Sequence, residues 1–361
     1  MELVSIVDRF GEGTTLLIGG AVIGALFGAF AQQSKFCLRA AAVEFARGSI
    51  GPKTATWLLV FTAAVLGTQL LSFGGYLATN EARQIASPQS LSGALLGGLM
   101  FGSGMVLARG CSSRLLVLSA TGNLRALLSG LVFAVFAQAS LKGSLSPVRN
   151  EIATYATTSM IEGNDLLSTI GANSTYAMMI SVICALAAIG FATYRNLGVK
   201  TAVSSILVGA AIPLAWWFTS EMGKIAFEPV KMEAITFTGP SADTLMFFLN
   251  PPGAAIDFSI GLVPGVFIGS FLAALLTGQL QLQGFEGGHS MKRYLAGGAL
   301  MGFGGMLAGG CAVGAGVTGA SVFAITAWVT LFAIWLSAGI TDWFVDRRQS
   351  SFSPAFGQPA E

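Results

Sequence analysis

The chain has 361 residues, of which 10% are charged and 53% belong to the hydrophobic set. An average soluble domain carries about 25% charged residues, so this chain has too few to cover a soluble fold of its size. The net charge of +2 is too small for a phosphate-binding field, and four cysteines in a long apolar chain make no disulfide framework. The composition excludes nucleic acid as a partner and indicates a polytopic protein of the lipid bilayer.

Nine apolar stretches are long enough to cross a bilayer, which takes about 17–25 residues in a helix. In chain order they cover about 14–31, 54–76, 91–108, 124–141, 171–194, 201–220, 254–278, 293–308 and 322–341. The eighth stretch is short for a full span. We therefore expect an all-α polytopic membrane protein, with residues 1–361 forming a single integral membrane domain and 342–361 a short polar tail.

The distribution of Lys and Arg predicts the orientation of these spans. The start of the chain carries three acidic residues and Arg9, and the other nearby basic residues follow the first apolar stretch, which favours a retained first helix over a signal peptide. Most of the 19 Lys and Arg residues fall on one side of a nine-span layout, and the short loop 195–200 carries two of them with no acid. The positive-inside rule then places the N-terminus outside and the C-terminus in the cytoplasm. The long loops near 142–170 and 221–253 would face outside and hold short helices.

An internal repeat is centred on two cysteines. Residues 97–111 read GGLMFGSGMVLARGC and residues 297–311 read GGALMGFGGMLAGGC, with eight of the fifteen positions identical and no gap. Both copies end in Gly-Cys, at Gly110-Cys111 and Gly310-Cys311. Because the chain has only four cysteines, this ending points to internal duplication more strongly than the shared glycines do.

The position of the two copies predicts how the halves are related. They lie on the third and eighth spans, so they run in opposite directions through the membrane. This predicts two inverted repeats, about 14–141 and 201–341, joined by a connector span at 171–194. In transporters built this way the substrate site lies near the bilayer midplane, on broken or re-entrant helices that meet at the repeat interface.

Glycine content predicts where the helices break. Each glycine costs about 0.8–1 kcal/mol relative to alanine inside a helix, although close packing of small residues explains Gly97 to Gly104 equally well. That alternative accounts less well for the Gly-Cys pairs. After Cys311 the chain continues with Gly314, Gly316 and Gly319, which predicts an irregular segment dipping into the membrane. Such backbone is tolerated where it lines a cavity.

The remaining cysteines and charged residues carry weaker signals. Cys37 follows the first span, where a turn and a short helix over 40–47 are expected, and it is either functional or an inert thiol. Cys184 lies in the connector and is expected to be a packing residue. Arg109 and Arg114 flank Cys111 and serve either as inner-face anchors or as electrostatic support for an anion. No Lys or Arg is expected deep in a span.

Metal and catalytic chemistry lack their usual ligands. The sequence has no CxxC motif and one histidine, His289, which is expected in a loop. No Cys-His arrangement offers a nucleophile with its base. We therefore predict no metal site, no cofactor and no catalytic residue.

The segments Ser34-Lys35-Phe36-Cys37, Gly110-Cys111 and Gly310-Cys311 resemble those of the YeeE/YedE family of bacterial inner-membrane sulfur transporters. The resemblance covers about 14–341. It implies uptake of thiosulfate, or of a related sulfur or selenium species, along a path lined by Cys37, Cys111 and Cys311. It also implies a TusA-like sulfur carrier as cytoplasmic partner, here expected as a separate chain.

The expected chemistry suits a conduit, because thiols are weak donors and a conduit must release what it binds. No counterpart of Cys37 is found near the sixth span, where Pro213 and its neighbours stand. Two alternatives stay open: a membrane protein that passes persulfide sulfur or selenium through covalent cysteine chemistry, and a channel for another solute in which the cysteines only pack.

Overall fold

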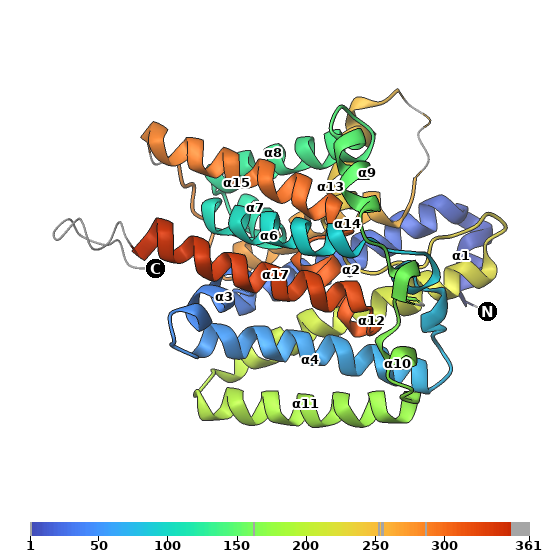
Figure 1. The fold of residues 1–361 in the computed structure, drawn as a ribbon. Helices are drawn as coiled ribbons and strands as arrows, with labels where there is room; N and C mark the ends of the chain where they lie inside the picture. The colour runs from blue at the N-terminus through green and yellow to red at the C-terminus, as the bar shows by residue number, and fades with distance from the viewer. Residues whose placement is uncertain (1, 162, 252, 254–255, 286, 348–361) are drawn as a thin grey trace.

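The computed structural model describes residues 2–161, 163–251, 253, 256–285 and 287–347. This part of the chain is helical, with long helices side by side and shorter ones at their ends (Figure 1). The helices are α1 (Glu2–Phe10), α2 (Glu12–Ser34), α3 (Leu38–Ala46), α4 (Pro52–Phe73), η1 (Thr79–Glu81), α5 (Arg83–Ala86), α6 (Leu91–Leu107), α7 (Ser112–Ala120), α8 (Leu124–Leu141), α9 (Ser146–Thr154), η2 (Thr158–Ile161), α10 (Leu166–Thr169), α11 (Ser174–Tyr194), α12 (Val199–Ile225), α13 (Thr238–Leu249), α14 (Phe258–Leu276), α15 (Gly287–Leu307), η3 (Ala312–Thr318), α16 (Gly319–Ser321), α17 (Ile325–Asp342) and η4 (Trp343–Arg347).

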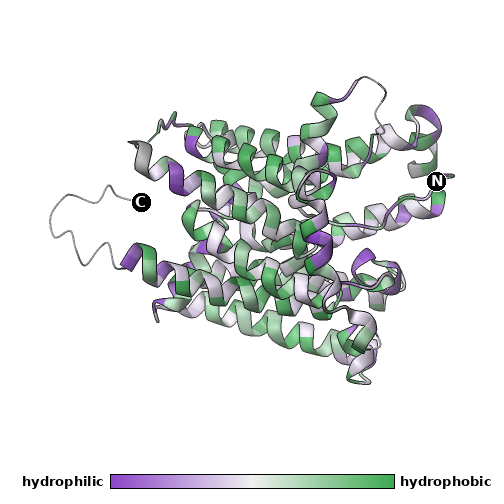
Figure 2. Cartoon of the chain, turned by 45° about the horizontal axis from the view of Figure 1, so that its top comes forward, coloured by the Kyte–Doolittle hydropathy of each residue, from purple (hydrophilic) through white to green (hydrophobic). Residues whose placement is uncertain are grey.

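The described residues contain nine helical segments that are long and apolar enough to cross a membrane, as the sequence predicts. Hydrophobic residues dominate the long helices, and hydrophilic residues gather toward the ends of the bundle (Figure 2). The protein is therefore a multi-pass helical membrane protein. Three of the nine segments include a break and are longer than expected: Glu12–Ala46, Leu91–Ala120 and Ser290–Ser321.

Several expected boundaries are wrong by a few residues. The eighth span is not short, because α15 begins at Gly287, and His289 consequently lies in a helix and not in a loop. The ninth span begins at Ile325, after a break, and not at residue 322. The first two residues of the expected stretch 254–278 and residues 348–361 of the expected tail lie outside the described residues.

The bundle has two ends, which we name by the chain termini (Figure 1). The N-terminal face carries α1, α9 and α10, and the opposite face carries α3 and η4, the last described helix. The two long loops contain short helices, as expected: α9, η2 and α10 in one, and α13 in the other.

Helices α6 and α15, which carry the two copies of the repeat, cross through glycines. A side-chain carbon on Gly97 would lie 2.5 Å from the carbonyl oxygen of Gly304, and one on Gly104 would lie 2.7 Å from that of Gly297. The low numbers of one helix meet the high numbers of the other, so the two helices run antiparallel. Both expectations for these glycines thus hold together: they permit close packing, and the helices end shortly after them.

The helix contacts come in matched pairs. Helix α6 packs against α17 while α15 packs against α8, and α2 packs against α14 while α4 packs against α12. Consider an exchange of the first span with the sixth, the second with the seventh, the third with the eighth and the fourth with the ninth. This exchange converts the first contact of each matched pair into the second. The short helices follow the same exchange, since α3 packs on α4 and α17, and α13 packs on α14 and α8.

Candidate functional site

Cys111 stands at a break in the third span. Helix α6 ends at Leu107, and Arg109 adopts the left-handed conformation with φ of 55°. Cys111 then precedes α7 as its N-terminal cap residue, with extended backbone. Its thiol is buried and lies 3.4 Å from the hydroxyl oxygen of Ser113. The glycine-rich pattern therefore predicts the position of this break correctly.

Cys311 stands at the equivalent break in the eighth span. Helix α15 ends at Leu307, and Gly309, at the position that matches Arg109, has φ of 77°. Cys311 is buried, and its sulfur accepts a hydrogen bond of 3.4 Å from the backbone N–H of Gly314. The sequence predicts an irregular segment after Cys311, and this prediction is wrong, because Ala312–Thr318 form the π-helix η3. Wide turns of this kind are rare and often occur at functional sites.

Cys37 lies at a third break, between α2 and α3. Lys35 has φ of 52° and ends α2, and Cys37 caps the N-terminus of α3 with extended backbone. The expected turn and short helix are therefore present, with the helix beginning at Leu38. Cys37 is half-buried and packs against the core that contains Cys111 and Cys311.

Cys37 and Cys111 form a pair. Their thiols lie close enough to interact although the two residues are far apart in the sequence, and both are free thiols. The guanidinium group of Arg114, on the first turn of α7, interacts electrostatically with both thiols. One of its nitrogens, Nη1, is buried without a hydrogen-bonding partner. The third apolar segment runs over Leu91–Ala120 and so includes Arg114, whereas the sequence places Arg114 just after a span that ends at residue 108.

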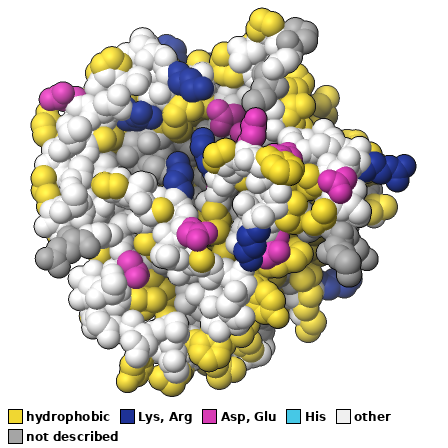
Figure 3. Space-filling view, turned by 90° about the vertical axis from the view of Figure 1, so that its right-hand side faces the viewer, with side chains coloured by type: hydrophobic (Ala, Val, Ile, Leu, Met, Phe, Trp, Pro, Cys, Tyr) yellow, Lys and Arg dark blue, Asp and Glu magenta, His cyan; other side chains and the backbone are white. Residues whose placement is uncertain are grey.

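A polar hollow opens on the N-terminal face. Figure 3 looks onto this end and shows Lys, Arg, Asp and Glu side chains around a depression. The underlying cavity has a volume of about 330 Å³. Its charged lining residues are Arg83, Lys142, Arg149, Lys231, Glu233, Asp243 and Asp257. We call this cavity the vestibule.

The vestibule leads toward Cys311. Gly309 and Gly310, the two residues before Cys311, form part of its wall. A smaller cavity of about 10 Å³ continues inward and is lined by Arg83, Glu233 and Gly314 among others. We call this smaller cavity the neck, and one of its lining residues, Gly314, donates its backbone N–H to the Cys311 sulfur. The charged residues of the vestibule come from segments far apart in the chain, so no local sequence pattern indicates this cavity.

The other sequence-predicted residues fall outside this arrangement. Arg109 is exposed, and Gly110 is buried behind the side chain of Leu115. Cys184 is exposed on α11, so the expectation that it packs in the core is wrong. Helix α11 packs mainly on α4, which leaves most of its surface facing outward. Among the residues that the structure describes, no cluster of three His, Cys, Asp or Glu side chains could hold a metal ion.

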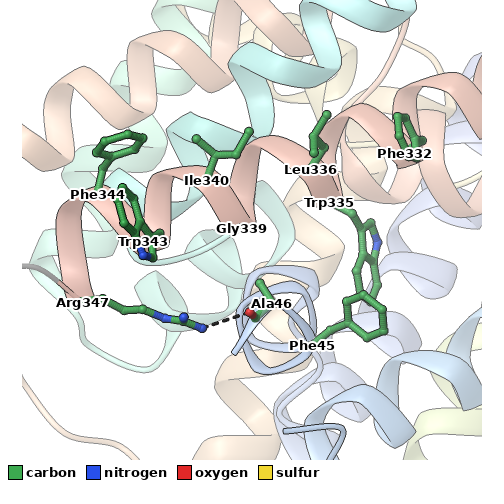
Figure 4. A pocket seen from close by; sticks show the side chains of 10 residues that line it. All are labelled: Phe45, Ala46, Phe332, Trp335, Leu336, Gly339, Ile340, Trp343, Phe344 and Arg347. Carbon is green, nitrogen blue, oxygen red and sulfur yellow. Dashed lines mark hydrogen bonds between the residues drawn. The ribbon is translucent and has the colours of Figure 1, made fainter. Parts of the chain in front are cut away.

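A second, larger pocket is far less suited to an anion than the vestibule. It has a volume of about 550 Å³ and lies between α3 and the C-terminal part of α17 (Figure 4). Its lining is aromatic and aliphatic, and the guanidinium group of Arg347 reaches across it to the carbonyl oxygen of Ala46 at 2.9 Å. None of the three site cysteines lines it.

Two known proteins and one family model match most of this chain. The chain is 24% identical over 351 residues to the thiosulfate transporter TsuA of Escherichia coli strain K12, covering 92% of this chain and 95% of that protein. It is 24% identical over 342 residues to the thiosulfate transporter TsuA of Spirochaeta thermophila, covering 91% of this chain and 99% of that protein. The family described as Sulphur transport matches residues 33–340, which is most of the chain. This protein therefore belongs to the YeeE/YedE sulphur-transport family.

Proposed function

We propose that this protein is a thiosulfate permease that takes up the anion through a path lined by Cys311, Cys111 and Cys37. The observation that carries the proposal is the placement of these cysteines at three helix breaks, with the charged vestibule beside one of them. The relatives named as thiosulfate transporters suggest the substrate. The protein then works in the bacterial inner membrane as a transporter and not as an enzyme.

The proposed architecture is a pair of inverted repeats. It is supported by the matched helix contacts and by the antiparallel crossing of α6 and α15. A two-fold exchange of the halves would place one break toward each face, so that Cys311 opens to the N-terminal face and Cys111 to the opposite face. The positive-inside rule assigns the N-terminal face to the outside and the opposite face to the cytoplasm.

The vestibule supports the entry of an anion. Four of its lining residues are basic: Arg83, Lys142, Arg149 and Lys231. A concave surface with basic side chains raises the local concentration of anions. Arg83 is fixed at the inner end, where its guanidinium group donates to the carbonyl oxygen of Gly309 at 3.0 Å.

The paired thiols and Arg114 support the exit. The anion would receive weak hydrogen bonds from Cys37 and Cys111 and would face the charge of Arg114. A weak donor lets the anion leave again, whereas a buried cation offsets the cost of removing the dianion from water. Arg109, which is exposed at the opposite face, would act on the anion only after it has left the thiols.

The test is growth on thiosulfate as the sole sulfur source. Cells that lack their own thiosulfate uptake should grow when they express this protein and should not grow when they express the Cys111→Ala, Cys311→Ala double variant. Uptake of radiolabelled thiosulfate into proteoliposomes checks the same result without metabolism. Failure of the purified wild type to take up thiosulfate contradicts the proposal.

A separate TusA-like carrier on the cytoplasmic side is proposed as the partner that receives the sulfur species. The proposal is supported by the family resemblance alone. Co-purification of a tagged carrier with this protein from detergent-solubilised membranes, compared with an unrelated membrane protein, would test it.

A further inference from the structure

Glu233 lies where the vestibule meets the neck, since it lines both cavities. Its side chain lines both the vestibule and the neck, and Arg83 is the other charged residue that lines both. The neck has a volume of about 10 Å³, which is room for about one water molecule. A sulfur dianion is larger than a water molecule, so it must pass Glu233 at close range.

The backbone around Glu233 is held in place on two sides. The hydroxyl group of Thr219, on α12, donates to the carbonyl oxygen of Glu233 at 2.7 Å. Two residues later, Thr318 of η3 donates to the carbonyl oxygen of Ile235, also at 2.7 Å. Glu233 therefore cannot leave the neck by a simple shift of an exposed loop. Neutralisation is the available way to remove its charge from the path.

The carboxyl group has one direct partner. The hydroxyl group of Ser259, at the start of α14, donates to Oε1 of Glu233 at 3.0 Å. Burial raises the pKa of Glu233 above its ordinary value, and the negative charge of Asp257 raises it further. The Ser259 hydrogen bond and the positive charges of Arg83 and Lys231 lower this pKa and so oppose the rise. The vestibule contains three further charged groups, Lys142, Arg149 and Asp243.

We propose that Glu233 is a proton-operated gate at the neck of the vestibule. The anion passes to Cys311 when the carboxyl group is neutral and is repelled when it is ionised. The ionised carboxylate also competes with the anion for the charge of Arg83. Binding of one proton from the N-terminal face removes both effects. The inference rests on the proposed thiosulfate uptake and adds its regulation by pH.

The experiment measures the initial rate of thiosulfate uptake into proteoliposomes between about pH 5 and about pH 8, on the alkaline side of the usual glutamate pKa of about 4.3. Thiosulfate keeps both charges in this range, so a dependence on pH comes from the protein. The wild-type rate should rise as the pH falls, by up to about tenfold per unit on the alkaline side of the midpoint, because one proton binds. Glu233→Gln, which stays neutral, should transport at a rate that no longer depends on pH.

Two further variants make the result specific. Ser259→Ala removes the hydrogen bond that favours the carboxylate, so the midpoint should move to higher pH. Asp243→Asn changes an acidic residue of the vestibule that does not line the neck; its absolute rate is free to change, but the midpoint should stay near that of the wild type. If Glu233→Gln does not fold, the Ser259→Ala shift decides the question.

The gate and the transport function fail in different ways. A wild type that takes up thiosulfate at a rate independent of pH, or a Glu233→Gln variant that keeps the wild-type pH profile, overturns the gate and leaves the function intact. If the wild type takes up no thiosulfate at any pH, the function fails. Infrared difference spectroscopy then still tests the gate, since a carboxyl band that titrates above about pH 4.3 and is lost in Glu233→Gln supports it, and the absence of such a band contradicts it.

Discussion

Replacing Cys111 by alanine distinguishes the three hypotheses for the cysteines: a hydrogen-bonding path, covalent sulfur transfer and simple packing. In the structure the Cys111 thiol lies beside the thiol of Cys37 and 3.4 Å from the hydroxyl oxygen of Ser113. In the proposed path the anion takes the place of these neighbours as it passes. Removing one thiol thus removes one weak donor and leaves the other two cysteines in place.

The expected loss follows from the strength of one hydrogen bond. One hydrogen bond contributes a net free energy of about 0.5–1.5 kcal/mol, or about 1.5–3 kcal/mol when one partner is charged. A thiol donor lies at the lower end of either range. We therefore expect Cys111→Ala to cost about 1–2 kcal/mol at this step, which corresponds to a factor of about 5–30 in the uptake rate. Cys111→Ser should recover part of the loss, since a hydroxyl group still donates.

A covalent relay predicts a different pattern. If sulfur or selenium is carried as a persulfide on Cys111, neither alanine nor serine can hold it, and both variants should lose uptake completely. Mass spectrometry of the wild type during turnover should then find an added sulfur on the thiol. Partial recovery of uptake in Cys111→Ser therefore indicates a path of hydrogen bonds, whereas complete loss in both variants indicates covalent chemistry.

The assay is the initial rate of radiolabelled thiosulfate uptake into proteoliposomes, normalised to the amount of protein. Cys184→Ala is the matched control, because Cys184 is exposed on α11 and should keep the wild-type rate. Thermal unfolding in detergent checks that each variant is folded. Wild-type rates in both Cys111→Ala and Cys311→Ala would refute the cysteine path and leave the packing alternative.

Three further outcomes are expected. Arg114→Gln should lower thiosulfate uptake by about tenfold or more without loss of folded protein, because about 1.4 kcal/mol of charge interaction suffices for that factor; an unchanged rate would make Arg114 a structural residue. Gly304→Val should lower the unfolding temperature, since a side-chain carbon there would lie 2.7 Å from the carbonyl oxygen of Gly97 and overpacking costs about 1–3 kcal/mol. Reporter fusions should place the two chain termini on opposite sides of the membrane, and termini on the same side would contradict the inverted repeat.

The spans and the breaks could be predicted because their causes are local. A helix that crosses a bilayer needs a long apolar stretch, and each of the nine segments has one. The Gly-Cys endings likewise mark places where the chain cannot continue as an ordinary α-helix. Both cysteines indeed precede a new helical segment, at Ser112 and at Ala312.

The contacts inside the site could not be predicted because they join distant parts of the chain. Nothing near Cys37 in the sequence indicates that its thiol lies beside Cys111, and the sequence leaves open whether Arg114 is an anchor or supports an anion. The position of Glu233 beside the path could not be predicted for the same reason. It lies in a loop, and its burial depends on α12 on one side and η3 on the other.

The apparent lack of a counterpart to Cys37 has a structural explanation. The equivalent position does not adjoin the sixth span, because a loop separates α12 from α13, whereas α2 leads to α3 with few residues between them. Phe237 caps the N-terminus of α13 as Cys37 caps that of α3, and these two positions differ by 200, the same offset as Cys111 and Cys311.

Under the proposed two-fold exchange, Phe237 therefore corresponds to Cys37. It is fully buried, and its ring centroid lies 5.4 Å from that of Phe27. By the same exchange, Phe237 would stand beside Cys311 as Cys37 stands beside Cys111. The path would hold one thiol beside the vestibule and two toward the opposite face, so a nearly symmetric backbone carries an asymmetric set of donors. Such a difference in donors would let the anion be held more firmly on the side from which it is released.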